Sequence, residues 1–186
     1  MMKTVRERAD IIPALTEVFR SHGYEGASLA LIGQQTGLGK GSLYNFFPGG
    51  KEEMAAAVLE HIDGWFRSHV FESLRATTDP AAAISAMFEA TDRYFHSGGR
   101  VCIVGIFALS DVRDRFADAI NAYFAEWRDA LAEALRRLGK EPDLADALAE
   151  DIVAGIQGAL VTARALGDPA LFGRRLARLK TLIPLD

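Results

Sequence analysis

The chain has 186 residues, of which 49% are hydrophobic and 25% are charged, and its formal net charge is −4. This charge argues against a protein that coats nucleic acid non-specifically, because such proteins need a broad basic surface, although a local basic patch stays open. No apolar run reaches the roughly 18 to 20 residues that span a bilayer, and the start MMKTVRERAD lacks the apolar core of a signal peptide. We therefore expect a cytoplasmic protein with no membrane partner.

Cysteine and histidine usage argues against a structural metal. The single cysteine, Cys102, cannot form an internal disulfide, and the four histidines show no spacing typical of zinc ligands. We expect no metal site and no cofactor.

The abundance of Ala, Leu, Glu and Arg predicts an all-α fold of about nine helices. Apolar spacing predicts the first helix over residues 3–22, ended by Gly23. Pro13 does not suit the interior of that helix, because proline removes a backbone hydrogen bond. If Asp10 is the N-cap, Pro13 falls in the first turn, and residues 3–9 become a separate turn or arm.

Two short helices follow. Ser28 is the expected N-cap of a second helix, LALIGQQ, and after the turn TGLG the segment KGSLYNFF forms a third. Gly37 suits a turn residue with positive φ, and Leu38 is expected to pack between the two helices. The third helix is too short to be stable alone, so its apolar residues must pack on its neighbours.

The remaining elements are longer. A fourth helix is predicted from Lys51 to about Phe71, and a fifth begins at Pro80 with Asp79 as its N-cap. Four more helices are expected over residues 101–109, 111–138, 143–166 and 169–183. We divide the chain into an N-terminal three-helix domain, residues 1–50, and a C-terminal helical bundle, residues 51–186.

The second and third helices fit the physical description of a helix-turn-helix, whose second helix enters the DNA major groove. Lys40, Ser42, Tyr44 and Asn45 offer donors for phosphates or base edges, and small Gly39 and Gly41 leave room for a DNA backbone. Lys51 adds charge at the start of the fourth helix. Each feature alone also occurs in ordinary helix corners and solvated helix ends.

The whole segment SLALIGQQTGLGKGSLYNFFPGGKEEM, preceded by FRSHGYEGA, resembles the TetR family of bacterial transcriptional regulators. The resemblance covers about residues 3 to 60. It implies a homodimer whose first three helices read an operator in double-stranded DNA, with a fourth helix leading to a domain for ligand binding and dimerisation. The proline-glycine-glycine insert and GRVCIVGIFALSD look like the branch of multidrug-resistance-operon regulators, which would imply a bulky aromatic ligand.

The family motif assigns roles to individual positions. Matching positions imply phosphate contacts for Ser28, Lys40, Ser42, Tyr44 and Lys51, and an approach to bases for Gly41, Leu43 and Asn45. Many family members carry His or Tyr where this chain has Asn45, whose amide can bond adenine or grip phosphate. The N-terminal arm offers Lys3, Arg6 and Arg8 as minor-groove contacts.

A small-molecule effector is expected between the fourth and seventh helices, where aromatic side chains could form an apolar wall with few polar groups. The same aromatics could equally be ordinary core. The candidate ligand-binding residues are His61, Trp65, Phe66, Phe88, Phe95, Phe107, Tyr123, Trp127 and Gln157.

Small residues in the eighth helix, including Gly155 and Gly158, would let a partner helix approach closely, so we expect a homodimer through the eighth and ninth helices. The predicted function is that of a repressor that binds a near-palindromic operator and is released by a small, aromatic or hydrophobic molecule. The alternatives are an activator or a ligand-independent regulator of the same fold.

More distant alternatives are an enzyme or a helical interaction protein that does not bind DNA. For an enzyme, the candidates are Cys102 and the pair Asp92 and His96, with Glu89 one turn earlier. A helical Asp-His pair is usually a surface ion pair, and a lone cysteine in an apolar segment usually packs as a small hydrophobe. We therefore expect no enzymatic activity.

Overall fold

The computed structural model describes residues 7–76 and 78–183, and every regular element within them is helical. The α-helices are α1 (Arg8–Gly26), α2 (Leu29–Thr36), α3 (Lys40–Phe46), α4 (Gly50–Phe66), α5 (Glu72–Ala76), α6 (Pro80–Tyr94), α7 (Ile103–Ala108), α8 (Ala117–Arg137), α9 (Pro142–Leu166) and α10 (Ala170–Lys180). A π-helix, η1 (Arg67–Phe71), and two 3-10 helices, η2 (His96–Gly98) and η3 (Arg113–Phe116), connect them. Since α4, η1 and α5 run on without a break, these residues form the nine helices expected, and the all-α prediction is confirmed.

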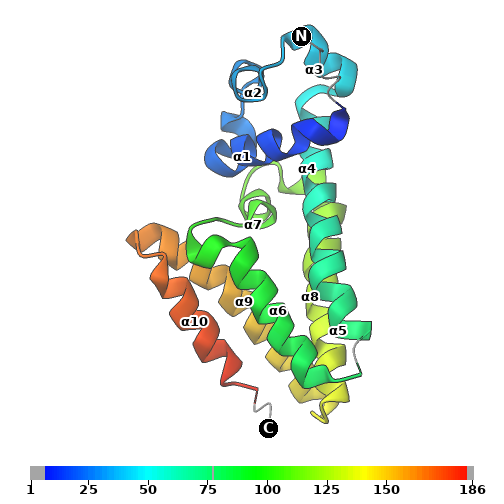
Figure 1. The fold of residues 1–186 in the computed structure, drawn as a ribbon, viewed down its shortest axis with the longest axis vertical. Coiled ribbons are helices and arrows are strands. Elements are labelled where there is room, and N and C mark those ends of the chain that lie inside the picture. The colour runs from blue at the N-terminus through cyan, green and yellow to red at the C-terminus, as the bar shows by residue number, and fades with distance from the viewer. Residues whose placement is uncertain (1–6, 77, 184–186) are drawn as a thin grey trace, which may run out of the picture.

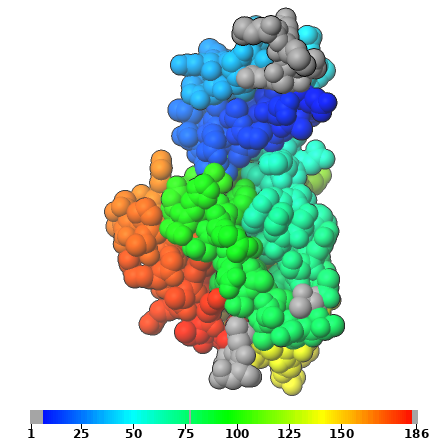
Figure 2. All heavy atoms as spheres, in the orientation of Figure 1, coloured from blue at the N-terminus to red at the C-terminus, as the bar shows by residue number. Residues whose placement is uncertain are grey.

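The molecule has a small head and a longer body (Figure 1). Helices α1 to α3 form the head at one end, and α4 runs from it along the body beside α8. Helices α6, α9 and α10 complete the body, with α9 and α10 packed against each other. The space-filling view shows the head as a lobe above the wider body (Figure 2). Among the described residues no helix is both long and apolar enough to cross a bilayer.

The start of α1 differs from the prediction. The N-cap is Glu7, and its backbone N–H donates to Asp10 Oδ2 at 2.9 Å, so Asp10 lies in the first turn rather than at the cap. Pro13 is therefore inside the helix, where its missing N–H leaves one backbone carbonyl without its helical donor. The predicted end is confirmed in part, because Gly23 has φ of +65° and kinks α1 before its last turn.

The arm residues have different outcomes. Lys3 and Arg6 lie outside the described residues. Arg8 pairs with Glu53 of α4 at 2.7 Å, and its guanidinium lies 4.6 Å from the centre of the Phe47 ring. Arg8 thus connects the start of α1 with the end of α3 and with the first turn of α4.

An aromatic core holds the body together. The centre of the Phe66 ring lies 5.0 Å from the ring centre of Tyr123 and 5.1 Å from that of Trp127. The indole N–H of Trp127 donates a hydrogen bond to Met87 Sδ at 3.5 Å. These contacts join α4, α6 and α8 at distances that favour tilted aromatic pairs. At the surface, Glu126 of α8 pairs with both Arg67 and Arg75 at 2.9 Å, which fixes the π-helical bulge and α5 against α8.

Local helix signals in the body were predicted correctly. Asp79 Oδ1 accepts the backbone N–H of Ala82 at 3.0 Å, and Pro80 occupies the first turn of α6. Gly167 ends α9 in the left-handed region with φ of +62°. These caps satisfy backbone groups that a helix end leaves unpaired.

Gly33 of α2 lies close to the backbone of the turn between α2 and α3. A Cβ added at Gly33 would lie 2.9 Å from the backbone oxygen of Leu38, so Gly33→Ala should destabilise the protein by about 1–3 kcal/mol. The control is Gly64→Ala in α4, where an added Cβ meets nothing within 4 Å and should stabilise by about 0.5–1 kcal/mol. Urea unfolding measures both values. Equal free energies of unfolding for the two variants would contradict the close approach.

Candidate nucleic-acid interface and effector cavity

The turn of the helix-turn-helix is built by short-range contacts. Ser28 Oγ accepts the backbone N–H of Leu31 at 3.2 Å, which confirms Ser28 as the N-cap of α2. Gly37 ends α2 with φ of +67°, in the left-handed region that favours glycine, as predicted. The backbone N–H of Leu38 then donates to Gly33 O at 3.2 Å, and the half-buried Leu38 side chain packs on the core. The turn therefore holds α3 at a fixed angle to α2.

Helix α3 presents a polar face at the far end of the head. Lys40, Gly41, Ser42, Tyr44 and Asn45 are exposed, and Lys40 is the only charged residue between Ala27 and Gly50. Leu43 is 0% exposed. The prediction that Leu43 approaches DNA bases is wrong, because this side chain packs inward and holds α3 on the head.

Lys51 has a structural role within the protein. Its ammonium donates to the backbone oxygen of Tyr24 at 3.0 Å and lies 4.4 Å from the centre of the Tyr24 ring. Glu25 lies 3.9 Å away. Only one of its three N–H donors is used by this hydrogen bond, so a phosphate contact at Lys51 stays a prediction.

Tyr24 is the centre of the joint between head and body, and we call its surroundings the Tyr24 joint. Its ring stacks on the Phe19 ring, with 6.1 Å between the two ring centres. It packs edge-on against Phe107 and Phe116, whose ring centres lie 6.0 Å and 5.7 Å from its own. Arg115 of η3 donates to the Tyr24 hydroxyl at 3.1 Å and pairs with Glu52 of α4 at 3.3 Å. The joint therefore connects α1, α4, α7 and η3 through both apolar and charged contacts.

A cavity of about 610 Å³ lies beside this joint, and we call it the junction cavity. Its walls come from the head and the body, because α1 contributes residues together with α7, α8 and α9. Its volume falls within the range usual for sites that bind small molecules. The lining residues are Arg20, Ser21, Gly23, Val101, Cys102, Gly105, Ile106, Ala108, Leu109, Phe124, Gln157, Leu160, Val161, Arg164 and Ala165.

Of the predicted ligand-binding residues, Gln157 alone lines the junction cavity. Five aromatics of the predicted set are at most 1% exposed, line none of the five cavities described here and pack as core. These five core residues are Phe66, Phe95, Phe107, Tyr123 and Trp127.

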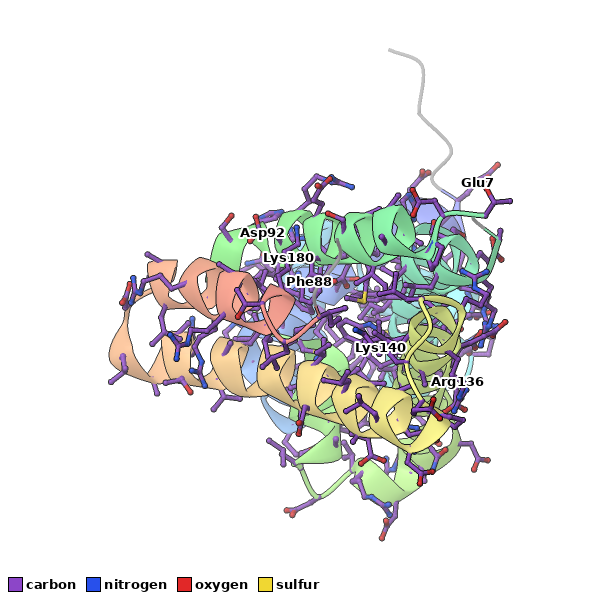
Figure 3. The ribbon with its side chains drawn as sticks, turned by 90° about the horizontal axis from the view of Figure 1, so that it is seen from below. Glu7, Phe88, Asp92, Arg136, Lys140 and Lys180 are labelled. Carbon is purple, nitrogen blue, oxygen red and sulfur yellow. The ribbon has the colours of Figure 1, made fainter. Side chains whose placement is uncertain are left out.

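The other predicted ligand residues lie at separate places on the surface. His61 and Trp65 line a second cavity of about 380 Å³ together with Arg20 of α1. Phe88 lines a groove between α6 and α10, where the Lys180 ammonium lies 5.7 Å from its ring centre. Figure 3 shows Phe88, Asp92 and Lys180 gathered in this groove. The predicted set therefore does not converge on one site.

Cys102 is a buried N-cap residue. Its sulfur accepts the backbone N–H of Gly105 at 3.4 Å at the start of α7. Burial raises the pKa of the Cys102 thiol, which disfavours the reactive thiolate. Asp92 accepts a hydrogen bond from Ser97 at 3.1 Å. Neither residue has the surroundings of a catalytic group.

The sequence patterns missed the charged residues of the junction cavity. Arg20 occupies the face of α1 that also carries buried Thr16, and its side chain is only 7% exposed. The sequence offered no clear signal for Arg20, because Thr16 and Glu17 one turn earlier make this part of α1 look like an ordinary polar face. Arg164 gave no clear signal either, since it lies in a mixed stretch near the end of α9.

Comparison with known proteins agrees with this geometry. Residues 11–58 match the family of bacterial regulatory proteins of the TetR type, and residues 80–174 match the C-terminal domain of LmrA/YxaF-like transcriptional regulators. The chain is 30% identical over 158 residues to the HTH-type transcriptional regulator LmrA of Bacillus subtilis, covering 83% of this chain and 84% of that protein. The chain belongs to the TetR family of transcriptional regulators.

Solved TetR-family structures share the fold. A regulator from Legionella pneumophila has a TM-score of 0.82 and 20% identity, covering 98% of this chain and 99% of the other. The regulator CifR, solved as a cysteine mutant with a 26-base-pair operator DNA, has a TM-score of 0.75 and 24% identity, with 97% of each chain covered. The family matches and the LmrA relative make the chain a transcriptional regulator rather than an enzyme, and the LmrA/YxaF-like match supports the predicted branch of the TetR family.

Gly41 of α3 is exposed, so its substitution tests whether DNA approaches this helix closely. An added Cβ at Gly41 meets no atom of the protein within 4 Å, so Gly41→Ala should stabilise the free protein slightly. If Gly41 lies against DNA, the same methyl group should weaken binding at least about tenfold, or 1.4 kcal/mol. Fluorescence anisotropy with a duplex selected from a random-sequence library measures the affinity. Gly64→Ala is the matched control, and unchanged DNA affinity in Gly41→Ala would contradict close approach at this glycine.

Proposed function

We propose that this TetR-family protein is a cytoplasmic repressor that binds a near-palindromic operator as a homodimer and is released by a small molecule. The observation that carries the proposal is the exposed face of α3, on which Lys40, Ser42, Tyr44 and Asn45 offer only donor-bearing polar groups. Lys40, Ser42 and Tyr44 are the proposed phosphate contacts, and Asn45 is the proposed base contact. Ser28 is the N-cap of α2, and its exposed hydroxyl is a further proposed donor to phosphate.

Dimerisation is proposed through α9 and α10. One short recognition helix makes few contacts, whereas two helices spaced by whole DNA turns can read a palindrome. On α9, Val161 is 60% exposed and Leu166 is 68% exposed, which is unusual for large apolar residues on one helix end. Exposed Ala154 and Gly158 leave room on the same helix for a partner helix, which would lie beside the mouth of the junction cavity because Val161 also lines that cavity.

Release by a ligand would act through the Tyr24 joint. A ligand shifts a conformational equilibrium only by contacting the two states differently. The junction cavity has one wall on α1, including Gly23 directly before Tyr24, and other walls on the body. An occupant would therefore press on the segment that sets the angle of the head, and two heads at a changed spacing would no longer match successive major grooves.

The DNA-binding role is tested by the salt dependence of affinity. Each phosphate contact contributes a slope of about −0.9 to a plot of log affinity against log salt concentration. Lys40→Ala should weaken binding to all sequences and reduce that slope by about one. The matched control is Lys140→Ala, a lysine in the turn between α8 and α9 that lies outside the head and outside α10. An unchanged slope in Lys40→Ala would contradict the phosphate contact, and loss in the control would contradict the placement of the DNA face.

The coupling is tested with an effector found by thermal-shift screening, since a ligand stabilises the folded state that it binds. That effector should bind the free dimer more tightly than the operator-bound dimer. Arg115→Ala removes the contacts to the Tyr24 hydroxyl and Glu52 and should bring the two affinities closer together. Isothermal titration calorimetry with and without operator measures them. Equal affinities for wild-type free and operator-bound dimer would refute ligand-driven release.

Each of the two alternative regulators is distinguished by its own readout. An activator of the same fold would bind DNA equally well, but transcription in vitro would rise rather than fall when the protein is added. A ligand-independent regulator would show no stabilisation by any compound in the screen.

A further inference from the structure

The junction cavity carries an excess of positive charge. Two arginines, Arg20 and Arg164, line it, and among residues 7–76 and 78–183 no Asp or Glu does. Arg20 pairs with Glu17, but the same carboxylate also pairs with Arg100 at 3.5 Å, so one negative charge serves two guanidinium groups. Within the described residues, no ion pair is formed by Arg164.

The unpaired polar atoms of the cavity lining are hydrogen-bond donors. Arg20 has a side chain that is 93% buried, because only 7% is exposed, and its Nε has no partner among the described residues. Gln157 Nε2, on the α9 wall, is also buried, and its one neighbouring acceptor among the described residues is the weakly accepting sulfur of Cys102. A buried donor without an acceptor is costly, so these walls favour a ligand that brings acceptor oxygens.

The rest of the lining is apolar. Val101, Ile106 and Leu109 come from the segment that forms α7, Phe124 comes from α8, and Leu160 comes from α9. Leu109 is 84% exposed, which is unusual for a leucine and places apolar surface beside the polar groups. The cavity therefore offers cationic donors and an apolar wall at the same time.

We propose that the junction cavity binds an amphiphilic carboxylic acid, with its carboxylate at Arg164 and its apolar body against α7 and α8. The exposed Arg164 guanidinium is free to form a charge-assisted bond with a carboxylate, and Arg20 adds positive potential from the α1 wall. Contact with α1 makes such an acid a candidate for the effector. Only this consequence for DNA rests on the proposed function, because binding is tested on the free protein.

The test compares decanoate with decan-1-ol, which share an apolar chain and differ in charge at neutral pH. Isothermal titration calorimetry on the full chain, below the concentration at which decanoate forms micelles, should give at least tenfold tighter binding of decanoate. Arg164→Gln should remove most of that preference and leave decanol binding unchanged. Gln157→Glu, which places a carboxylate in the wall, should also weaken decanoate alone.

The control Arg175→Gln removes a cation of α10 outside the cavity and should retain the wild-type preference. Equal affinity for acid and alcohol, or no binding of decanoate, would overturn the ligand class. A preference that survives in both Arg164→Gln and Gln157→Glu would overturn the site. Size-exclusion chromatography and thermal unfolding confirm that the exposed Arg164 variant keeps the wild-type assembly and fold.

Titration of operator DNA separates this inference from the proposed function. Decanoate binding that depends on Arg164, but leaves DNA affinity unchanged, would support the cavity and refute ligand-driven release. Operator binding without any carboxylate preference would leave the regulator intact and overturn the inference.

Discussion

The position of Tyr24 depends on a single backbone feature, the positive φ of Gly23, which interrupts α1 and turns the chain back toward its own helix. This turn brings the Tyr24 ring onto Phe19, while Lys51 holds its carbonyl and Arg115 holds its hydroxyl. The ring also lies near both cations, with the Arg115 guanidinium 5.5 Å from its centre. Tyr24 therefore joins the head to the body through its ring, its hydroxyl and its backbone carbonyl, and the contact of Phe19 with Phe107 lies beside it.

The DNA-reading half of the site could be predicted because its information is local in sequence. Gly37 and the Ser28 cap specify the turn through contacts within a few residues, and the family motif spans the same short stretch. The error at Leu43 has a physical reason, since a seven-residue helix has too little intrinsic stability and must bury one large side chain to stay in place. The error in the N-cap of α1 also concerns neighbouring residues. Glu7 and Asp10 are both acidic, and the sequence alone does not show which of them is the N-cap.

The cavity could not be predicted, because its walls come from α1, α7, α8 and α9, which are distant in sequence. Periodicity identified which face of each helix is buried, and Phe66 of α4 and Tyr123 and Trp127 of α8 are indeed buried. It does not say whether a buried face meets another side chain or an open space. Phe66 and Trp127 meet each other across α4 and α8, whereas half-buried Phe124, on the same helix as Trp127, faces the cavity.

The place where an effector binds decides how strongly it can act on the head. An effector buried among Phe66, Tyr123 and Trp127 would contact the body alone, and its binding energy would reach the head only by deforming a densely packed core. An occupant of the junction cavity contacts α1 and the body directly, so any change in head angle changes its own contacts. Because coupling between sites equals the difference in ligand affinity between conformers, a site with walls on both moving parts can transmit more of its binding energy than one inside either part.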